Sequence, residues 1–160
     1  MMVLTFEDLY PIDQLHARGV VATKEHIEFA GIGDGMHVLD IGISYGIGGA
    51  SRVIASSRQC TVTGIDLTPE YVEVSRELTR RCGLADRIDY RQANALDLPF
   101  DDESFDHVLC HNVTMNIEDK AGLAKEITRV LKPGGHFSCV EAGLEPAGEP
   151  SFPLPCAQDA

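Results

Sequence analysis

Residues 38–49 read Val38-Leu39-Asp40-Ile41-Gly42-Ile43-Ser44-Tyr45-Gly46-Ile47-Gly48-Gly49, and this stretch decides the fold of the chain. The short apolar run at its start predicts a strand that is covered on both faces. The glycines after it permit a tight turn and let a ligand approach main-chain atoms closely. Residues 50–56 then predict a helix, whose first N–H groups can meet an anionic group. We therefore expect a nucleotide-type ligand site at the carboxyl end of a first strand.

The rest of the chain alternates between predicted helices and strands around this turn. A helix begins at Thr68-Pro69, a capping residue followed by proline, and Gly83 fits its end. Such alternation is typical of parallel sheets with right-handed crossovers. We predict an α/β fold with a Rossmann-like, doubly wound, mostly parallel sheet of about five strands and helices on both faces. Besides the first, strands are expected at residues 61–66, 88–91, 107–110 and 136–141.

A single domain is expected, because 160 residues suffice for one sizeable core. Residues 36–141 are assigned to this core, residues 1–35 to an N-terminal helical lid and residues 142–160 to a loop tail. Within the lid, Tyr10-Pro11 is interpreted as a turn, Asp13 as the cap of a short helix and Gly31 as the end of a second helix.

Composition narrows the range of partners. A formal charge of −12 argues against a nucleic-acid backbone and against an anionic membrane surface. The five cysteines are odd in number and have no C-x-x-C spacing, so we expect free, buried thiols and neither a disulfide framework nor a metal site. The N-terminus lacks a signal-peptide pattern and no apolar run reaches membrane-spanning length, which predicts a cytoplasmic protein.

Four sequence patterns resemble one known family. The order Asp40-x-Gly42-x-Ser44-x-Gly46 resembles motif I of the class I S-adenosyl-L-methionine (SAM)-dependent methyltransferases, with Ser44 in place of the usual middle glycine. The strings LPFDDESFD (98–106) and LKPGG (131–135) resemble later segments of that family, and DQLHARG (13–19) resembles its small-molecule enzymes of the sarcosine/dimethylglycine and tocopherol/ubiquinone type. The resemblance implies SAM-dependent methyl transfer to a small molecule, such as a glycine-type amine or a ring or lipid carbon or oxygen.

Spacing and resemblance together indicate the residues that would hold the cofactor. Asp66 ends the second strand at the distance expected of a ribose-binding carboxylate, although an acid here could also only cap a loop. The resemblance implies the other contacts, while a plain turn before Pro99 remains an alternative for the adenine segment. The implied contacts are Gly42, Ser44, Gly46 and Leu67 around the cofactor, Asp40 ordering the glycine loop, and Asn94 with the main chain of Ala95 and Leu96 at the adenine.

The fourth strand ends at His111, where sheets of this kind bind their ligands. We expect His111 to contact the ligand and name it the candidate catalytic base. Asn112 and Asn116 follow it, and a turn or capping role for Asn116 is equally compatible with the sequence. The resemblance makes Gln14, His16 and Arg18 candidate lid residues, and Gln14 and His16 are expected to contact the cofactor. Alternatively, these residues form the polar face of an amphipathic helix.

Related enzymes continue into an antiparallel hairpin, which this sequence lacks. The resemblance therefore implies either a fragment truncated at its C-terminus or a homodimer in which a second chain covers the fifth strand. Two rival functions stay open: a truncated protein that binds SAM or S-adenosylhomocysteine (SAH) without catalysis, and an NAD-dependent oxidoreductase. The second is weakened because Ser51 stands where the third glycine of the dinucleotide pattern belongs.

Overall fold

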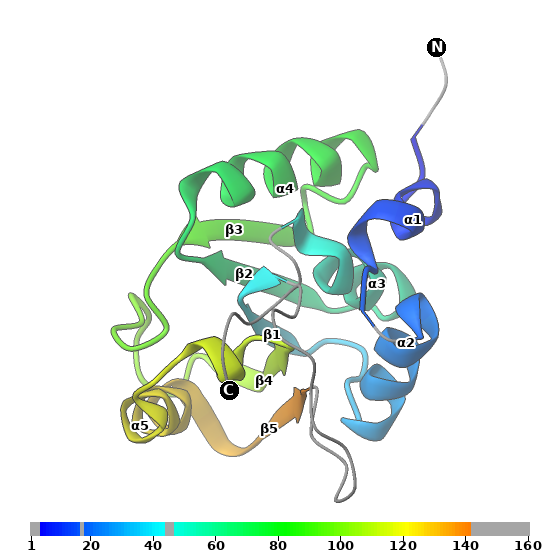
Figure 1. Cartoon of the computed structure of the whole chain (residues 1–160). Helices are drawn as coiled ribbons and strands as arrows, with labels where there is room; N and C mark the ends of the chain where they lie inside the picture. The colour runs from blue at the N-terminus through cyan, green and yellow to red at the C-terminus, as the bar shows by residue number, and fades with distance from the viewer. Residues whose placement is uncertain (1–3, 17, 44–46, 142–160) are drawn as a thin grey trace, which may run out of the picture.

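The computed structural model describes residues 4–16, 18–43 and 47–141, so Ser44 and Gly46 lie outside the described residues. All strand pairs of its sheet are parallel, in the order β3-β2-β1-β4-β5. This confirms the predicted doubly wound α/β architecture (Figure 1). The strands are β1 (His37–Ile41), β2 (Thr61–Asp66), β3 (Ile88–Gln92), β4 (Phe105–His111) and β5 (Leu131–Val140).

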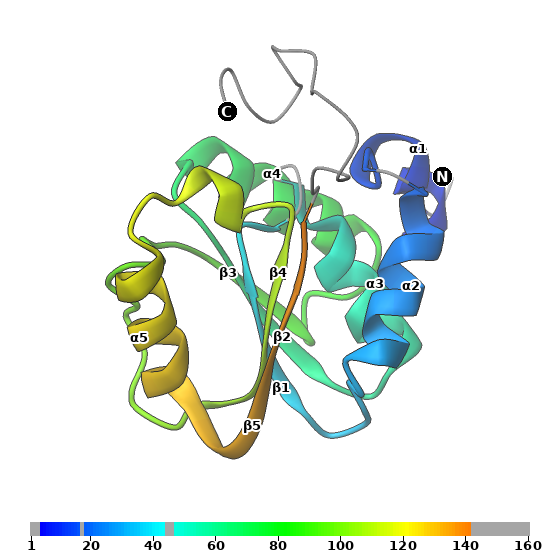
Figure 2. The same ribbon diagram turned by 60° about the horizontal axis from the view of Figure 1, so that its bottom comes forward.

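Helices cover both faces of the sheet (Figure 2). One layer holds α2 (Gly19–Phe29), α3 (Gly49–Ser57) and α4 (Pro69–Arg81), which pack into one apolar cluster with Val38 and Leu109. The other face is covered by α5 (Lys120–Val130), which packs against Leu39 and Ile41. Neighbouring residues of β1 therefore point into different clusters, which explains the unbroken apolar run of a central strand.

Short-range signals explain where several helices begin and end. Asp119 caps α5, since its Oδ1 accepts the Gly122 N–H at 2.8 Å. Gly31 and Gly83 follow α2 and α4 with φ of +67° and +71°, the left-handed conformation that favours glycine at a helix end. Thr68 precedes α4, but its own N–H is held by the Asp66 carboxylate at 2.9 Å.

Three details of the sequence-based interpretation are wrong. Pro11 lies in the first turn of α1 (Tyr10–Asp13), where its fixed φ suits a helix start, and does not form a separate turn. Asp13 ends this helix and caps nothing, because its carboxylate pairs with Arg52. Cys139 is exposed, since it lies on β5 at the edge of the sheet, whereas Cys60 and Cys110 are buried free thiols as expected.

Arg52 of α3 joins three parts of the chain from a fully buried position. Its guanidinium donates to Asp13 Oδ2 at 2.9 Å, to the Ile47 carbonyl at 2.6 Å and to Thr79 Oγ1 at 3.2 Å. The side chains of Arg52 and Asp13 are 0% and 1% exposed. The N-terminal segment, the main chain of Ile47 and α4 are thus fixed to one charge, which is costly to leave unpaired.

Replacing Arg52 with Met should lower the free energy of unfolding by about 3–5 kcal/mol, because the Asp13 carboxylate would stay buried without its partner. Urea unfolding followed by circular dichroism measures this. The double variant Asp13→Leu/Arg52→Met should recover a large part of the loss. Arg80→Met, at a side chain 65% exposed, should change stability by less than about 0.5 kcal/mol. If Arg52→Met and the double variant lost the same free energy of unfolding, the unpaired Asp13 carboxylate would not be the cause of the loss.

Candidate cofactor site

A cleft of about 200 Å³ opens where the carboxyl ends of β1, β2 and β3 meet the segment after β4. Strand order reverses between β1 and β4, and ligands of doubly wound sheets bind at such a point. Its walls are mainly apolar, with a carboxylate and two amides among them. The lining residues are Ile41, Gly42, Ile65, Asp66, Leu67, Ala93, Asn94, Ala95, Val113, Asn116 and Ile117.

Gly42 forms the floor of the cleft directly after β1. Its φ of +81° is left-handed, and its N–H donates to the Ile65 carbonyl at 2.8 Å. A β-carbon at this position would approach both methyl groups of Val113 to 2.5 Å. The position therefore requires glycine for two separate reasons, backbone conformation and contact with the segment after β4.

Asp66 lies at the mouth of the cleft, at the end of β2. Its Oδ1 accepts the Thr68 N–H at 2.9 Å, which fixes the carboxylate relative to the start of α4. A carboxylate has two oxygens and about four acceptor positions, so this bond leaves capacity for hydroxyl groups of a ligand. Leu67, which follows, is 67% exposed and forms the outer edge of the same wall.

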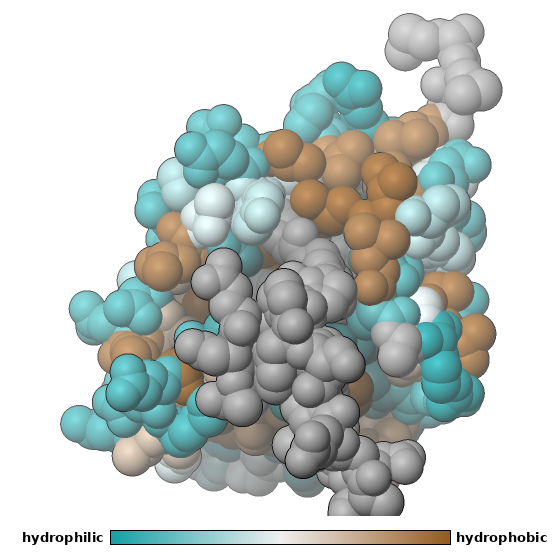
Figure 3. All heavy atoms as spheres, in the orientation of Figure 1, coloured by the Kyte–Doolittle hydropathy of each residue, from teal (hydrophilic) through white to brown (hydrophobic). Residues whose placement is uncertain are grey.

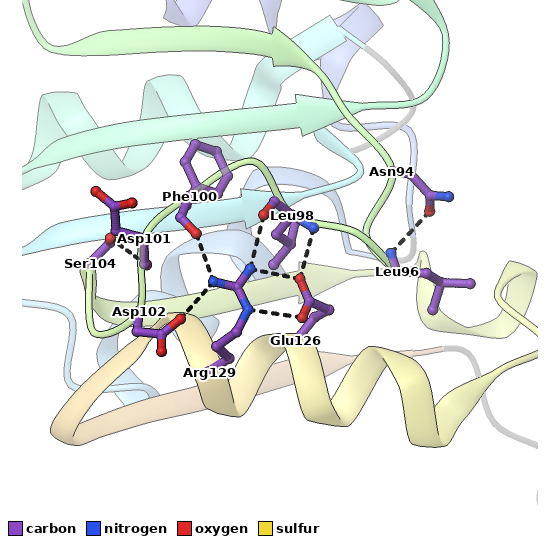
Figure 4. A network of polar contacts seen from close by, with 9 residues as sticks. All are labelled: Asn94, Leu96, Leu98, Phe100, Asp101, Asp102, Ser104, Glu126 and Arg129. Carbon is purple, nitrogen blue, oxygen red and sulfur yellow. Dashed lines mark hydrogen bonds and ion pairs between the residues drawn. The ribbon is translucent and has the colours of Figure 1, made fainter.

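Asn94 and Ala95 form the wall beyond β3. Asn94 Oδ1 accepts the Leu96 N–H at 3.0 Å (Figure 4). The Asn94 carbonyl accepts the Asp97 N–H at 3.0 Å. The side chain therefore closes its own turn and keeps one lone pair for a further donor. The Leu96 N–H already donates to Asn94 and Leu96 does not line the described cleft, so a contact of the Leu96 main chain with a ligand stays a prediction.

Asp40 lies behind the glycine turn rather than in the cleft. It is fully buried, and Ser51 of α3 donates its hydroxyl to Asp40 Oδ2 at 2.5 Å. Burial raises the pKa of Asp40 to about 6. The Asp40 carboxyl group thus links β1 to the start of α3, and Asp40 does not line this cleft.

His111 is buried at the end of β4, on the face covered by α2. Its ring centroid lies 4.1 Å from that of His16 and 5.6 Å from that of His26. Neither ring nitrogen has a hydrogen-bond partner within the described part of the chain. Burial, reinforced by His16 and His26, lowers the pKa of His111 to about 3. His111 is therefore a neutral imidazole near pH 7, and it does not line the described cleft.

The lid residues divide into two groups. Gln14 is buried, and Thr23 of α2 donates to its Oε1 at 2.6 Å, while His16 Nε2 lies 3.2 Å from the same hydroxyl. Arg18 instead forms an exposed ion pair with Glu25 at 2.6 Å and points to the surface. The structure therefore groups Gln14 and His16 with His111, and separates Arg18 from them.

Sequence reasoning missed two groups of residues. The apolar walls of the cleft come from Ile41, Ile65 and Val113, for which the position at a strand end was the available signal. His26 and His107 share the Ser138 hydroxyl, at 2.8 and 2.7 Å, behind His111. No sequence pattern links these three residues, because α2, β4 and β5 meet only in the folded chain.

The sequence matches the family described as "Methyltransferase domain" over residues 39–139. Cycloartenol-C-24-methyltransferase 1 from Oryza sativa subsp. japonica is 37% identical over 132 residues, which are 80% of this chain and 38% of that protein. The chain spans less than half the length of the first curated relatives it matches.

Solved structures agree with this match. The [4+2]-cyclase SpnF superposes with a TM-score of 0.72 at 28% identity, covering 76% of this chain and 44% of that one. A putative S-adenosyl-L-methionine-dependent methyltransferase from Methanococcus maripaludis superposes with a TM-score of 0.70 at 25% identity, covering 84% of this chain and 56% of that one.

Gly42→Ala should lower the free energy of unfolding by about 2–4 kcal/mol, the sum of a left-handed alanine and overlap with Val113. In a Val113→Ala background the overlap with the valine methyl groups is absent. There, Gly42→Ala should lower the free energy of unfolding by only about 1–2 kcal/mol, the cost of a left-handed alanine. Urea unfolding of the three variants measures both parts. Full additivity of the two single changes would contradict the contact.

Stability should fall as pH drops below about 6.5. Burial lowers the pKa of His107 to about 4 and that of His111 to about 3, so the unfolded state binds more protons in this window. Asp40, with its pKa raised to about 6, acts in the opposite direction between pH 6 and 4. The net loss should be about 1–1.5 kcal/mol per pH unit.

Asp40→Asn removes the opposing contribution and should roughly double this slope between pH 6 and 4.5. Urea titrations at half-unit pH steps measure the slopes for the wild type and the variant. A stability that does not change between pH 7 and 5 would show that the two histidines are not buried as neutral groups.

Proposed function

The chain belongs to the methyltransferase domain family, and on that premise we propose that its cleft binds SAM and that the protein transfers a methyl group to a small molecule. The observation that carries the proposal is the arrangement of Asp66 and Asn94. Asp66 ends β2, Asn94 follows the neighbouring strand β3 by two residues, and both line one mainly apolar cleft. A carboxylate beside an amide suits the ribose and base of a nucleoside.

The groups around the cleft fit the adenosine half of SAM. The Asp66 carboxylate would accept from the ribose hydroxyls, and Asn94 with Ala95 would meet the adenine edge. Ile41, Ile65 and Val113 offer apolar surface for the ring faces. Gly42 has no side chain, so a ligand in the cleft can approach its main-chain atoms closely. The expected roles of Ser44 and Gly46 remain part of this proposal.

SAM supplies a methyl group on a cationic sulfur, so positioning and exclusion of water suffice for much of the catalysis. His111 is the proposed base for an acceptor that must lose a proton. Burial keeps its imidazole neutral near pH 7 but, with a pKa of about 3, makes it a weak base, so the geometry supports binding more than proton removal. The His111 ring nitrogens and Gln14 Nε2 are buried without a partner in the described ranges. Such groups cost about 1–3 kcal/mol each until a ligand satisfies them, which supports a role in binding.

The proposed acceptor is an amine such as a glycine derivative, or a ring or lipid carbon or oxygen. The apolar surface over α1, at the end of the sheet where the strands stop, favours the ring or lipid class (Figures 2 and 3). Ile12 and Leu15 there are 53% and 59% exposed. A homodimer across the edge strand β5 stays a prediction, and so does a cytoplasmic location. Among the described residues, no helix is long and apolar enough to span a bilayer.

Titration calorimetry with SAH tests the cofactor site. Asp66→Ala should weaken binding by tenfold or more, since two hydrogen bonds to a carboxylate contribute roughly 2–4 kcal/mol. Asp89→Ala is the matched control, because Asp89 lies in the neighbouring strand with its side chain 54% exposed and paired with Arg91. Saturable binding that only Asp66→Ala weakens is the expected result.

The rival functions give different results in the same series. NAD that raises the melting temperature more than SAH does would indicate an oxidoreductase instead. SAH binding without methylation of any amine, phenol or sterol tested would favour cofactor binding alone. A folded protein that binds neither compound would refute the proposed site.

A further inference from the structure

Arg129 of α5 holds the main chain of the segment that carries Asn94. Its guanidinium donates to the Leu98 carbonyl at 2.9 Å and to the Phe100 carbonyl at 2.7 Å (Figure 4). Two contacts to carbonyls two residues apart use the planar fork of arginine, which lysine cannot reproduce. The contact therefore fixes both the position and the direction of this segment.

Glu126, one turn earlier on α5, completes the arrangement from the same side. Its carboxylate accepts two bonds from Arg129, at 2.9 and 2.7 Å, and the Leu98 N–H at 2.8 Å. The side chains of Arg129 and Glu126 are 28% and 14% exposed, so water competes little for these bonds. Both main-chain groups of Leu98 are thereby held by one ion pair, which we call the α5 clamp (Glu126 and Arg129).

The held segment leads without interruption to the wall of the cleft. Asn94 closes its turn onto Leu96 and Asp97, and Leu98 follows as a side chain only 4% exposed. Asn94 and Ala95 line the cleft, whereas Glu126 and Arg129 do not. The clamp therefore has a direct route to a bound ligand through this segment.

We propose that Glu126 and Arg129 are positioning residues for the cofactor, because they fix residues 94–100 so that Asn94 and Ala95 form the adenine-facing wall. This inference rests on the proposed function. It predicts that Arg129 and Asn94 act on cofactor binding as one unit, since removal of the clamp displaces the wall that Asn94 belongs to.

A double-mutant cycle on SAH affinity tests the clamp. Arg129→Met should weaken SAH binding by roughly tenfold, and Asn94→Ala by a similar factor. The double variant should lose clearly less than the product of the two factors. Affinities are compared at a temperature where circular dichroism shows each variant folded, and Arg129→Lys replaces Arg129→Met if the latter does not fold.

Asp102→Ala is the matched control. The Asp102 side chain is 74% exposed and forms an ion pair with Arg129. Its removal leaves both contacts of Arg129 to main-chain carbonyls in place. The SAH affinity of this variant should stay within about twofold of the wild type. A general destabilisation of α5 would lower stability but would not produce non-additive affinities with Asn94.

The outcomes separate the two proposals. SAH binding by the wild type with unchanged affinity in Arg129→Met, or with losses that multiply in the double variant, would overturn the clamp and leave the proposed function intact. Absence of SAH binding by the folded wild type would overturn the proposed function, and the clamp's role in cofactor binding with it.

Discussion

The buried ion pair between Arg52 and Asp13 is the constraint on which the rest of the structure depends. It removes two charges from water, and the surrounding bonds to Ile47 and Thr79 compensate the guanidinium. Gly49 lies so close to Asp13 and Gln14 that a β-carbon would overlap with them. The N-terminal segment is thus packed onto the start of α3, which places Gln14 and His16 beside His111.

The cleft itself follows from the sheet. Because the chain crosses from β3 back to β4 on the other side of β1, the segments that follow the strands diverge there and leave an opening. Successive side chains of β1 point to opposite faces of the sheet, so the two faces receive different residues. Asp40 points to α3 and binds Ser51, whereas Ile41 belongs to the cluster under α5 and lines the cleft. Two adjacent residues thus supply a hydrogen bond to α3 and an apolar part of the cleft wall.

Local signals in the sequence were sufficient for the elements and for part of the site. The left-handed backbone after β1 requires a glycine at position 42, and the spacing of the sequence placed the Asp66 carboxylate at the end of the second strand. The role of Asp13 could not be predicted, because it depends on Arg52, a partner 39 residues away that packing brings close. The same limit applies to His26 and His107, which meet at Ser138 only when three elements are assembled.

Two arginines on opposite faces of the sheet hold main-chain carbonyls in the same way. Arg52 binds the carbonyl of Ile47 after the glycine turn, and Arg129 binds the carbonyls of Leu98 and Phe100. Main-chain carbonyls are always available, so this contact does not depend on the side chains of the loops. Arg52 is fully buried and Arg129 is 28% exposed. The first therefore matters mainly for stability, and the second for the placement of a wall that a rigid ligand must fit.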